Sequence, residues 1–331
     1  MMGPDGNVRP FFVLAPVRVL LALLPLPVAA QDLPQLAWPV ACTLGETCYI
    51  QNLVDRDPGP GARDVTCESR TYDGHTGTDI ALPTLADQAA GVDVFATLPG
   101  TVVALRDGME DRLQPRDGTG PDIAGRECGN GVLLHHDGGW ESQYCHMAQG
   151  SLTVAEGDTV AAGDPLGLVG LSGNTEFPHL HLVIRRDGEV IDPFDPDGSW
   201  ACGEEPSPAL WAAPLPEGRL IGAGLSNGVP TFDAITAGEV DLPPTRTTPL
   251  VLWAYFHGTR AGDVIRLAIS DGTDVLFETD EIQESPLARG FRAGGRRAPE
   301  GGWPAGRYLG TALLLRNGAV LDRAETEVIL D

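Results

Sequence analysis

Short apolar runs, separated by turns rich in glycine and aspartate, most constrain what this chain can fold into. Runs such as 92–96, 131–135 and 179–184 are rich in Val, Leu and Ile, and each is bounded by turn residues. Runs of this length and composition are typical of β-strands, and no long stretch shows the 3.6-residue period of an amphipathic helix. We therefore predict an all-β domain with an antiparallel sheet over residues 71–200.

A second series of β-type runs occupies residues 220–331, with examples at 249–256 and 264–269. The regular spacing of the turns predicts a small β-sandwich. The proline-rich stretch 201–219 is expected to link the two domains. The sandwich carries no set of residues that resembles a catalytic site, and we expect its only histidine, His257, to be an ordinary surface or turn residue.

Residues 1–30 have the layout of a secretory signal peptide, which is a basic start, the apolar stretch 19–24 and small residues before a cleavage site. We predict cleavage after Ala30 and a mature protein that is periplasmic or secreted. The alternative is an uncleaved membrane anchor. Two prolines interrupt the apolar stretch, which is shorter than the ~20 residues of a spanning helix, so we expect no stable membrane span after cleavage.

The chain has six cysteines, and an even number in an exported protein favours disulfide bonds over free thiols. One pairing closes a short loop, another joins two predicted neighbouring strands, and the third follows by elimination, although many other pairings are possible. The preferred pairs are Cys42–Cys48, Cys128–Cys145 and Cys67–Cys202. Residues 31–70 hold three of the six cysteines, and we predict a disulfide-tied lead-in that packs beside the site or covers it.

The formal net charge of −24 argues against a nucleic-acid partner, because so acidic a chain repels phosphates. The chain has no lysine, which excludes Schiff-base chemistry and a Ser-Lys dyad. A long acidic insertion, 107–126, is either a wall of the cleft or a calcium loop. Its spacing does not match the EF-hand pattern.

Two short histidine motifs predict a catalytic metal site. His75 and Asp79 lie four residues apart, and His179 and His181 lie two apart. In extended chain both spacings place the two side chains on one face. Two imidazoles and a carboxylate, with a fourth position left for water, are the ligands of catalytic zinc, which lowers the pKa of the bound water and polarises a carbonyl.

Three further histidines lie in predicted strands or turns. By the same alternation Tyr144 and His146 should share a face, with Cys145 turned to the other side. We interpret the adjacent His135 and His136 as residues that flank a turn.

Together these motifs resemble peptidase family M23, the lysostaphin or LytM type. The similar blocks are 74–79, 129–132, 144–147, 156–163 and 170–181. They occur in the family's order and cover roughly residues 71–196. The resemblance implies a compact antiparallel LytM-like β-sheet with a groove along the metal.

The resemblance also implies a role for each residue of the site. His75, Asp79 and His181 would bind one Zn²⁺ per chain, while His146 and His179 would flank the water and the scissile carbonyl. One of this second pair would act as general base, and the other would stabilise the oxyanion or protonate the leaving amine.

Tyr144 could add a hydrogen bond to the oxyanion. The chain departs from the family at Met147, where leucine is usual, and at Phe177, where a small residue is more common. Neither position is in the ligand set.

The first functional hypothesis is an exported zinc metalloendopeptidase that hydrolyses peptide cross-links of peptidoglycan. The alternative is a non-hydrolytic protein that binds the wall or regulates other wall hydrolases, since some family members lose their ligands. All five site positions are filled here. A third hypothesis is latency, in which residues 31–70 cover the metal and Asn52 supplies a fourth ligand. The bond cleaved and the oligomeric state stay open.

Overall fold

The computed structural model describes residues 33–331 except 116–118, 200, 203–208, 213–214 and 216. The predicted signal peptide, 1–30, therefore lies outside the described residues. Among those described, no helix has the length and apolar character needed to cross a membrane.

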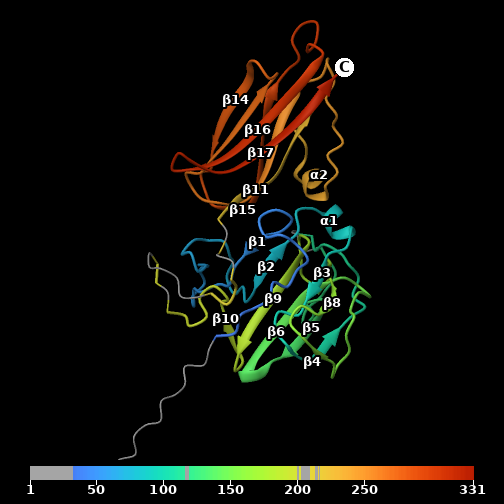
Figure 1. Ribbon diagram of the computed structural model, residues 1–331, viewed down its shortest axis with the longest axis vertical. Coiled ribbons are helices and arrows are strands. Elements are labelled where there is room, and N and C mark those ends of the chain that lie inside the picture. The colour runs from blue at the N-terminus through green and yellow to red at the C-terminus, as the bar shows by residue number, and fades with distance from the viewer. Residues whose placement is uncertain (1–32, 116–118, 200, 203–208, 213–214, 216) are drawn as a thin grey trace, which may run out of the picture. The chain divides into compact units, whose positions relative to one another are not determined.

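An eight-stranded antiparallel sheet carries the family motifs (Figure 1). Its strands in spatial order are β1 (Tyr49–Asn52), β2 (Thr78–Ala81), β9 (His179–Arg186), β6 (Trp140–Met147), β5 (Asn130–His135), β4 (Gly100–Arg106) and β7 (Thr159–Val160), and β10 (Glu189–Ile191) pairs with β9. The lead-in thus supplies an edge strand, β1, to the sheet.

The remaining elements of this part are small. Strand β3 (Asp93–Phe95) pairs with β8 (Pro165–Leu168) in a separate two-stranded sheet. Helix α1 (Leu85–Ala89) and one short 3-10 turn, 137–139, complete it.

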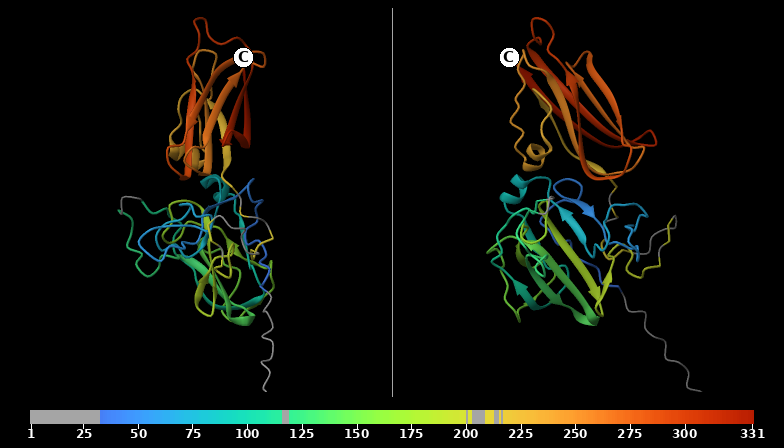
Figure 2. Two further views of the ribbon diagram at one scale, coloured as in Figure 1. Left: turned by 90° about the vertical axis from the view of Figure 1, so that its left-hand side faces the viewer. Right: turned by 180° about the vertical axis from the view of Figure 1, so that it is seen from behind.

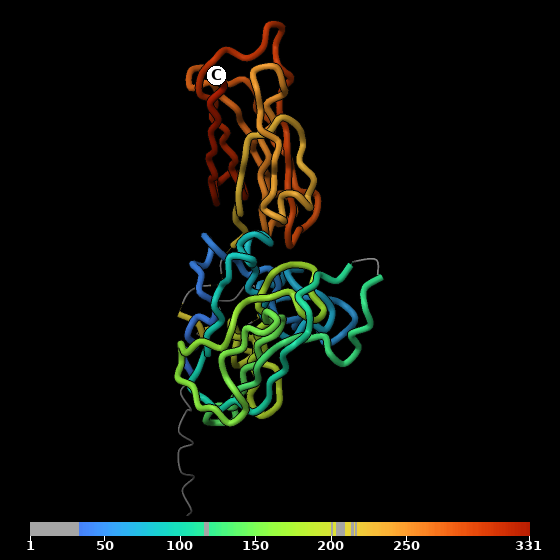
Figure 3. The backbone as a smooth tube through the Cα atoms, turned by 90° about the vertical axis from the view of Figure 1, so that its right-hand side faces the viewer, coloured from blue at the N-terminus to red at the C-terminus, as the bar shows by residue number. Residues whose placement is uncertain are grey.

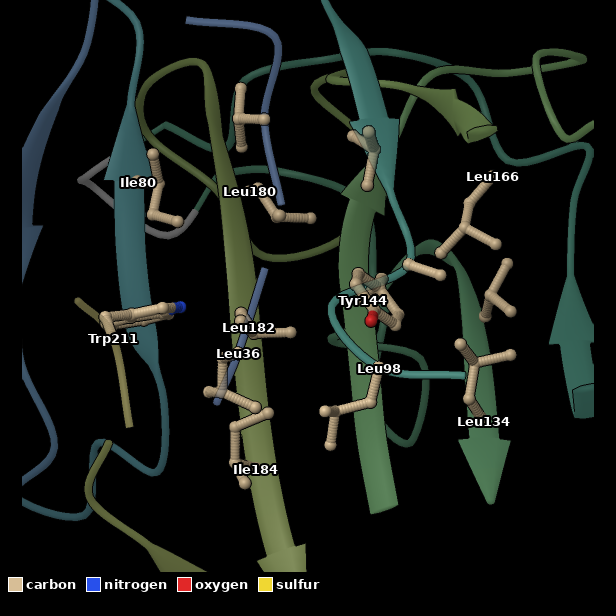
Figure 4. Close-up of a cluster of buried hydrophobic side chains, with 14 of the residues drawn as sticks. Leu36, Ile80, Leu98, Leu134, Tyr144, Leu166, Leu180, Leu182, Ile184 and Trp211 are labelled. Atoms are coloured by element: carbon tan, nitrogen blue, oxygen red, sulfur yellow. The ribbon is translucent and has the colours of Figure 1, made fainter. Parts of the chain in front are cut away.

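One face of the large sheet packs on the hydrophobic core, and the period-2 alternation of β9 sets which side chains it receives. Leu180, Leu182 and Ile184 of β9 are all buried in that core, beside Ile80 of β2 and Leu134 of β5 (Figure 4). The alternate residues of β9 therefore point to the opposite face, where His181 lies.

The connection between β4 and β5, whose backbone path is drawn in Figure 3, has no helix or strand among its described residues, 107–115 and 119–129. Its acids bind neighbouring backbone. Asp111 accepts hydrogen bonds from Leu171 N at 2.6 Å and Gln149 N at 2.8 Å, and Asp107 accepts one from Gly150 N at 2.8 Å. These carboxylates therefore hold the loop against neighbouring backbone. Because they are engaged in this way, they give no support to the alternative of a calcium-binding loop.

Two antiparallel sheets form the C-terminal region and enclose its hydrophobic core (Figure 2). One contains β11 (Arg219–Ser226), β12 (Leu250–Thr259) and β15 (Leu287–Arg296), and the other contains β14 (Val275–Ile282), β13 (Val264–Ser270), β16 (Gly306–Arg316) and β17 (Ala319–Leu330). Helix α2 (Phe232–Ala237) precedes β12. The prediction of an all-β fold with an antiparallel sheet followed by a sandwich is confirmed.

The prediction for His257 is wrong. This residue lies inside β12 with 1% of its surface exposed, and its ring stacks on Tyr49 at a centroid distance of 4.5 Å. Burial, together with the charges of Arg70 and Arg219, lowers the pKa of His257 to about 3. It is a neutral packing residue because its strand is covered on that side.

The three disulfides are the pairs that the sequence favoured. They are Cys42–Cys48, Cys67–Cys202 and Cys128–Cys145. Two of them fasten the lead-in, and the third joins the start of β5 to β6.

Candidate metal centre

Three side chains converge on one point of the sheet's open face. His75 Nε2 lies 3.1 Å from Asp79 Oδ1 and 3.2 Å from His181 Nδ1, and His181 Nδ1 lies 2.8 Å from the same carboxylate oxygen. Asp79 stands directly opposite His181 in the pairing of β2 with β9. His75 and Asp79 are both buried, and His181 is partly open.

His75 reaches this point from a turn and not from a strand. Its backbone N–H donates to Tyr72 O at 3.0 Å, and β2 begins only at Thr78. The expectation that His75 and Asp79 share the face of one extended run is therefore wrong, although the two side chains do meet. Gly77 lies between them against the His181 ring, where an added Cβ would stand 2.7 Å from Cε1.

The lead-in holds two of these side chains from behind. His75 Nδ1 lies 2.7 Å from the carbonyl oxygen of Leu53, which can only accept, so Nδ1 carries a proton and the ring in its neutral form presents a bare Nε2. Asn52 Nδ2 donates to Asp79 Oδ2 at 2.7 Å, which leaves Oδ1 facing the histidines. Asn52 thus contacts a candidate ligand from the far side.

These donor atoms fit a zinc ion. Zn–N and Zn–O bonds of about 2.0–2.2 Å in a tetrahedron separate the ligand atoms by roughly 3.3 Å, close to the three distances found. Burial alone raises the pKa of the Asp79 carboxyl, but its interactions with the surrounding histidines outweigh burial and hold that pKa well below its usual range. A bare imidazole nitrogen and a carboxylate this close together need a shared cation or proton.

His146 and His179 complete the site on its other side. His146 Nδ1 donates to Ser172 O at 2.8 Å, and His179 Nδ1 donates to Phe177 O at 2.9 Å. Their ring centroids lie 4.7 Å apart, and His179 Nε2 lies 3.5 Å from Asp79 Oδ1.

The environments of the two outer histidines favour the neutral imidazole, because the pKa of each ring is lowered. Burial, reinforced by the charges of neighbouring histidines, lowers the pKa of His146 well below its usual value. Burial also lowers the pKa of His179 and outweighs the opposing charge of Asp79. Since Nδ1 holds the proton in each ring, both Nε2 atoms can accept one. His146, His179 and His181 also offer nitrogens within 4.8 Å of one another, so the two groups of three share His181.

A backbone irregularity brings His146 to the site. This residue has φ = 65°, rare for a side chain other than glycine, and the register of β5 with β6 shifts beside it. Its N–H donates to Cys128 O at 2.8 Å. Alternation along β6 breaks here, so Cys145 and His146 both line the cleft.

Tyr144 does not reach the site, and the prediction that it supports an oxyanion is wrong. Its ring is fully buried among apolar side chains (Figure 4), and its hydroxyl accepts from Thr97 N at 2.8 Å and bonds Ser142 Oγ at 3.0 Å. The prediction assumed that Tyr144 and His146 point to the same face of the strand. The irregular backbone at His146 turns its side chain to the opposite face from Tyr144.

A cleft of about 220 Å³ opens over these residues. Three site histidines, His75, His146 and His181, line it. The lining also includes Tyr72, Glu127, Gln143 and Arg185. None of the described residues of the insertion 107–126 lines the cleft, so this part of the insertion does not form the cleft wall that the sequence suggested. A larger cavity of about 500 Å³ is lined by other segments and contains no candidate residue.

Sequence reasoning missed the positioning role of Asn52 and the place of Arg185 in the cleft. No local pattern indicates the first, because the Asn52–Asp79 contact joins strands far apart in sequence. Arg185 could have been found, since it lies four residues after His181 and so on the same face of the strand.

Comparison with known proteins agrees with this geometry. Residues 73–193 match the model of peptidase family M23, so this part of the chain is similar to that family. The chain is 37% identical over 65 residues to the DD-carboxypeptidase/endopeptidase Mpg of Neisseria meningitidis serogroup B, which covers 20% of this chain and 14% of that protein.

Two further relatives differ from each other in the function that their names give. One is the peptidoglycan DD-endopeptidase ShyA of Vibrio cholerae serotype O1, with 29% identity over 113 residues, 34% of this chain and 20% of that protein. The other is the murein hydrolase activator EnvC of Escherichia coli K12, with 39% identity over 62 residues, 19% of this chain and 14% of that protein. The matches thus span a fifth or less of each relative's length.

Proposed function

We propose that this protein is a zinc metalloendopeptidase that hydrolyses peptide cross-links of peptidoglycan. The observation that carries the proposal is the convergence of five side chains on one point, beside a cleft that three of them line. His75, Asp79 and His181 form a ligand set on one side, and two neutral histidines stand on the other. Catalytic zinc sites have three protein ligands and one open position.

A zinc ion held by His75 Nε2, Asp79 Oδ1 and His181 Nδ1 would supply a water that ionises near neutral pH and an electrophile for the scissile carbonyl. The protein's own part is to fix the donors. Leu53 O sets the tautomer of His75, and Asn52 holds Asp79 in orientation.

His146 and His179 move the protons. In each ring the Nδ1 proton is engaged with a backbone carbonyl, which leaves Nε2 free to accept a proton. One of them takes a proton from the attacking water. The lowered pKa of both rings makes that proton easy to return to the leaving amine.

The substrate class rests on the relatives, two of which carry the word endopeptidase in their names. The predicted export signal would bring the mature chain to the compartment where the wall lies. Its disulfides fit such an oxidising compartment.

A regulatory role is the second candidate, and the similarity to a murein hydrolase activator favours it. In that case the zinc site would be idle and the chain would act through another hydrolase. The filled site positions favour hydrolysis, because regulators have no need to keep both the ligands and the proton-transfer histidines.

The test compares mature protein carrying Asp79→Asn with the matched variant Asp158→Asn. Asp158 is an exposed turn residue that accepts a hydrogen bond from Ala155 N. Each is incubated with purified cross-linked peptidoglycan, with and without a chelator, and products are read by mass while bound zinc is measured. We expect Asp79→Asn to lose zinc and cross-link cleavage and Asp158→Asn to keep both. Bound zinc without cleavage by the unmodified chain would favour the regulatory role.

A further inference from the structure

We propose that Arg185 forms a carboxylate-binding subsite of the cleft and recognises a free carboxylate of the substrate peptide away from the scissile bond. This inference rests on the proposed peptidase function. It names a substrate feature that the metal site alone does not select.

The placement of Arg185 follows from the strand period. His181, Val183 and Arg185 occupy alternate positions of β9 and all line the cleft. On the neighbouring strand, Cys145 pairs with His181 and Gln143 pairs with Val183, so both strands contribute to one floor. At about 3.3 Å per residue, Arg185 lies roughly 13 Å along β9 from His181. An extended peptide spans that distance in about four residues.

The charge of Arg185 is not neutralised by the protein. Its Nη1 donates to the neutral side-chain oxygen of Gln143 at 2.9 Å, which orients the guanidinium without balancing its charge. The acid opposite it across the strands, Glu141, is engaged instead with His135 Nε2 at 2.9 Å. Among the described residues no carboxylate pairs with Arg185 within 4.0 Å.

Arg185 is also unusual within the cleft and within the chain. It is the only arginine among the cleft's lining residues, in a protein of net charge −24 that offers many carboxylates as partners. The next residue, Arg186, points to the other face and lies 5.2 Å over the ring of Trp140. A half-buried, oriented and unpaired guanidinium at the end of a substrate cleft suits a carboxylate, which it can bind through two parallel hydrogen bonds.

The experiment uses mature zinc-loaded protein and cross-linked stem-peptide dimers purified from peptidoglycan with their free carboxylates. The same dimers, chemically amidated, form the second substrate. Three variants are compared with the unmodified chain: Arg185→Gln, Arg185→Lys and, as the matched control on the other face, Arg186→Gln. Zinc content and thermal unfolding are measured for each to confirm that the fold and the metal site persist.

We expect Arg185→Gln to lower kcat/KM roughly 10- to 100-fold on the carboxylate dimers, mainly through KM, because a charge-assisted hydrogen bond is lost. The loss should largely vanish on the amidated dimers, and Arg185→Lys should recover part of it. Arg186→Gln should affect both substrates equally. An equal loss on both substrates from Arg185→Gln, or no loss on either, would overturn the subsite.

Binding separates this inference from the proposed function. If the unmodified chain cleaves neither dimer, the peptidase proposal fails, and isothermal titration of the same dimers then decides about Arg185. Carboxylate dimers that bind the unmodified chain roughly 10- to 100-fold more tightly than Arg185→Gln would support the subsite. Equal binding would reject it.

Discussion

Replacing Asn52 with alanine should weaken zinc binding although Asn52 is not expected to touch the metal. The side chain donates to Asp79 Oδ2 at 2.7 Å, and both residues are buried, with 8% and 2% of their surfaces exposed. A hydrogen bond to a charged acceptor contributes about 1.5–3 kcal/mol, and its loss leaves a buried carboxylate oxygen without a partner. Loss of such an outer contact lowers metal affinity roughly 10- to 100-fold.

The assay is zinc affinity of the folded mature chain, measured by competition with a chromophoric chelator. Asn227→Ala is the matched control, because Asn227 makes one amide-to-carbonyl hydrogen bond, to Pro243 O at 3.0 Å, in the C-terminal sandwich. Zinc affinity of Asn52→Ala within twofold of the unmodified chain, at unchanged thermal stability, would refute the positioning argument. A gain of activity in Asn52→Ala would instead support the latency hypothesis, in which Asn52 blocks the metal.

Two further predictions concern packing and pH. Gly77→Ala should lower the free energy of unfolding by about 1–3 kcal/mol and displace His181, because the new Cβ would stand 2.7 Å from ring atom Cε1. Zinc titration should therefore show weaker zinc binding. The control Gly222→Ala, whose new Cβ meets no atom within 4 Å, should bind zinc normally. Burial raises the pKa of Asp192 to about 6 from 3.8. The folded state therefore holds that proton more tightly, and stability falls as pH rises from about 4 through about 6. Urea unfolding should show that Asp192→Asn is more stable than the unmodified chain by up to about 3 kcal/mol at pH 7 to 8. This gain in stability should vanish near pH 4. An equal gain at pH 4 and at pH 8 would contradict the pKa argument.

The candidate metal ligands could be predicted from the sequence because their spacing rules are local. His179 and His181 lie on a regular strand, where the period of two holds, and Asp79 follows from the pairing of its own strand. His75 does lie in the cluster, as predicted. The reason given was partly wrong, because His75 lies in a turn and not in an extended run with Asp79. The short histidine motifs carried the inference more than the strand geometry did.

The errors lie where regular geometry ends or where distant segments meet. The left-handed backbone at His146 breaks the alternation, and nothing in its residue type announces that conformation. Tyr144 was misplaced for that reason. His257 was misassigned because its burial comes from a contact with Tyr49, and no pattern within β12 encodes that distant partner.

The disulfide Cys128–Cys145 beside the cleft fixes the backbone at His146. Cys145 directly precedes His146, and Cys128 bonds to its sulfur while offering its own carbonyl to the His146 N–H. The backbone that carries His146, the residue proposed to transfer protons, is thus fastened by a bond that forms only under oxidation. We expect the backbone at His146 to reach this geometry only after the chain meets an oxidising environment, and to be held less firmly while both cysteines are reduced.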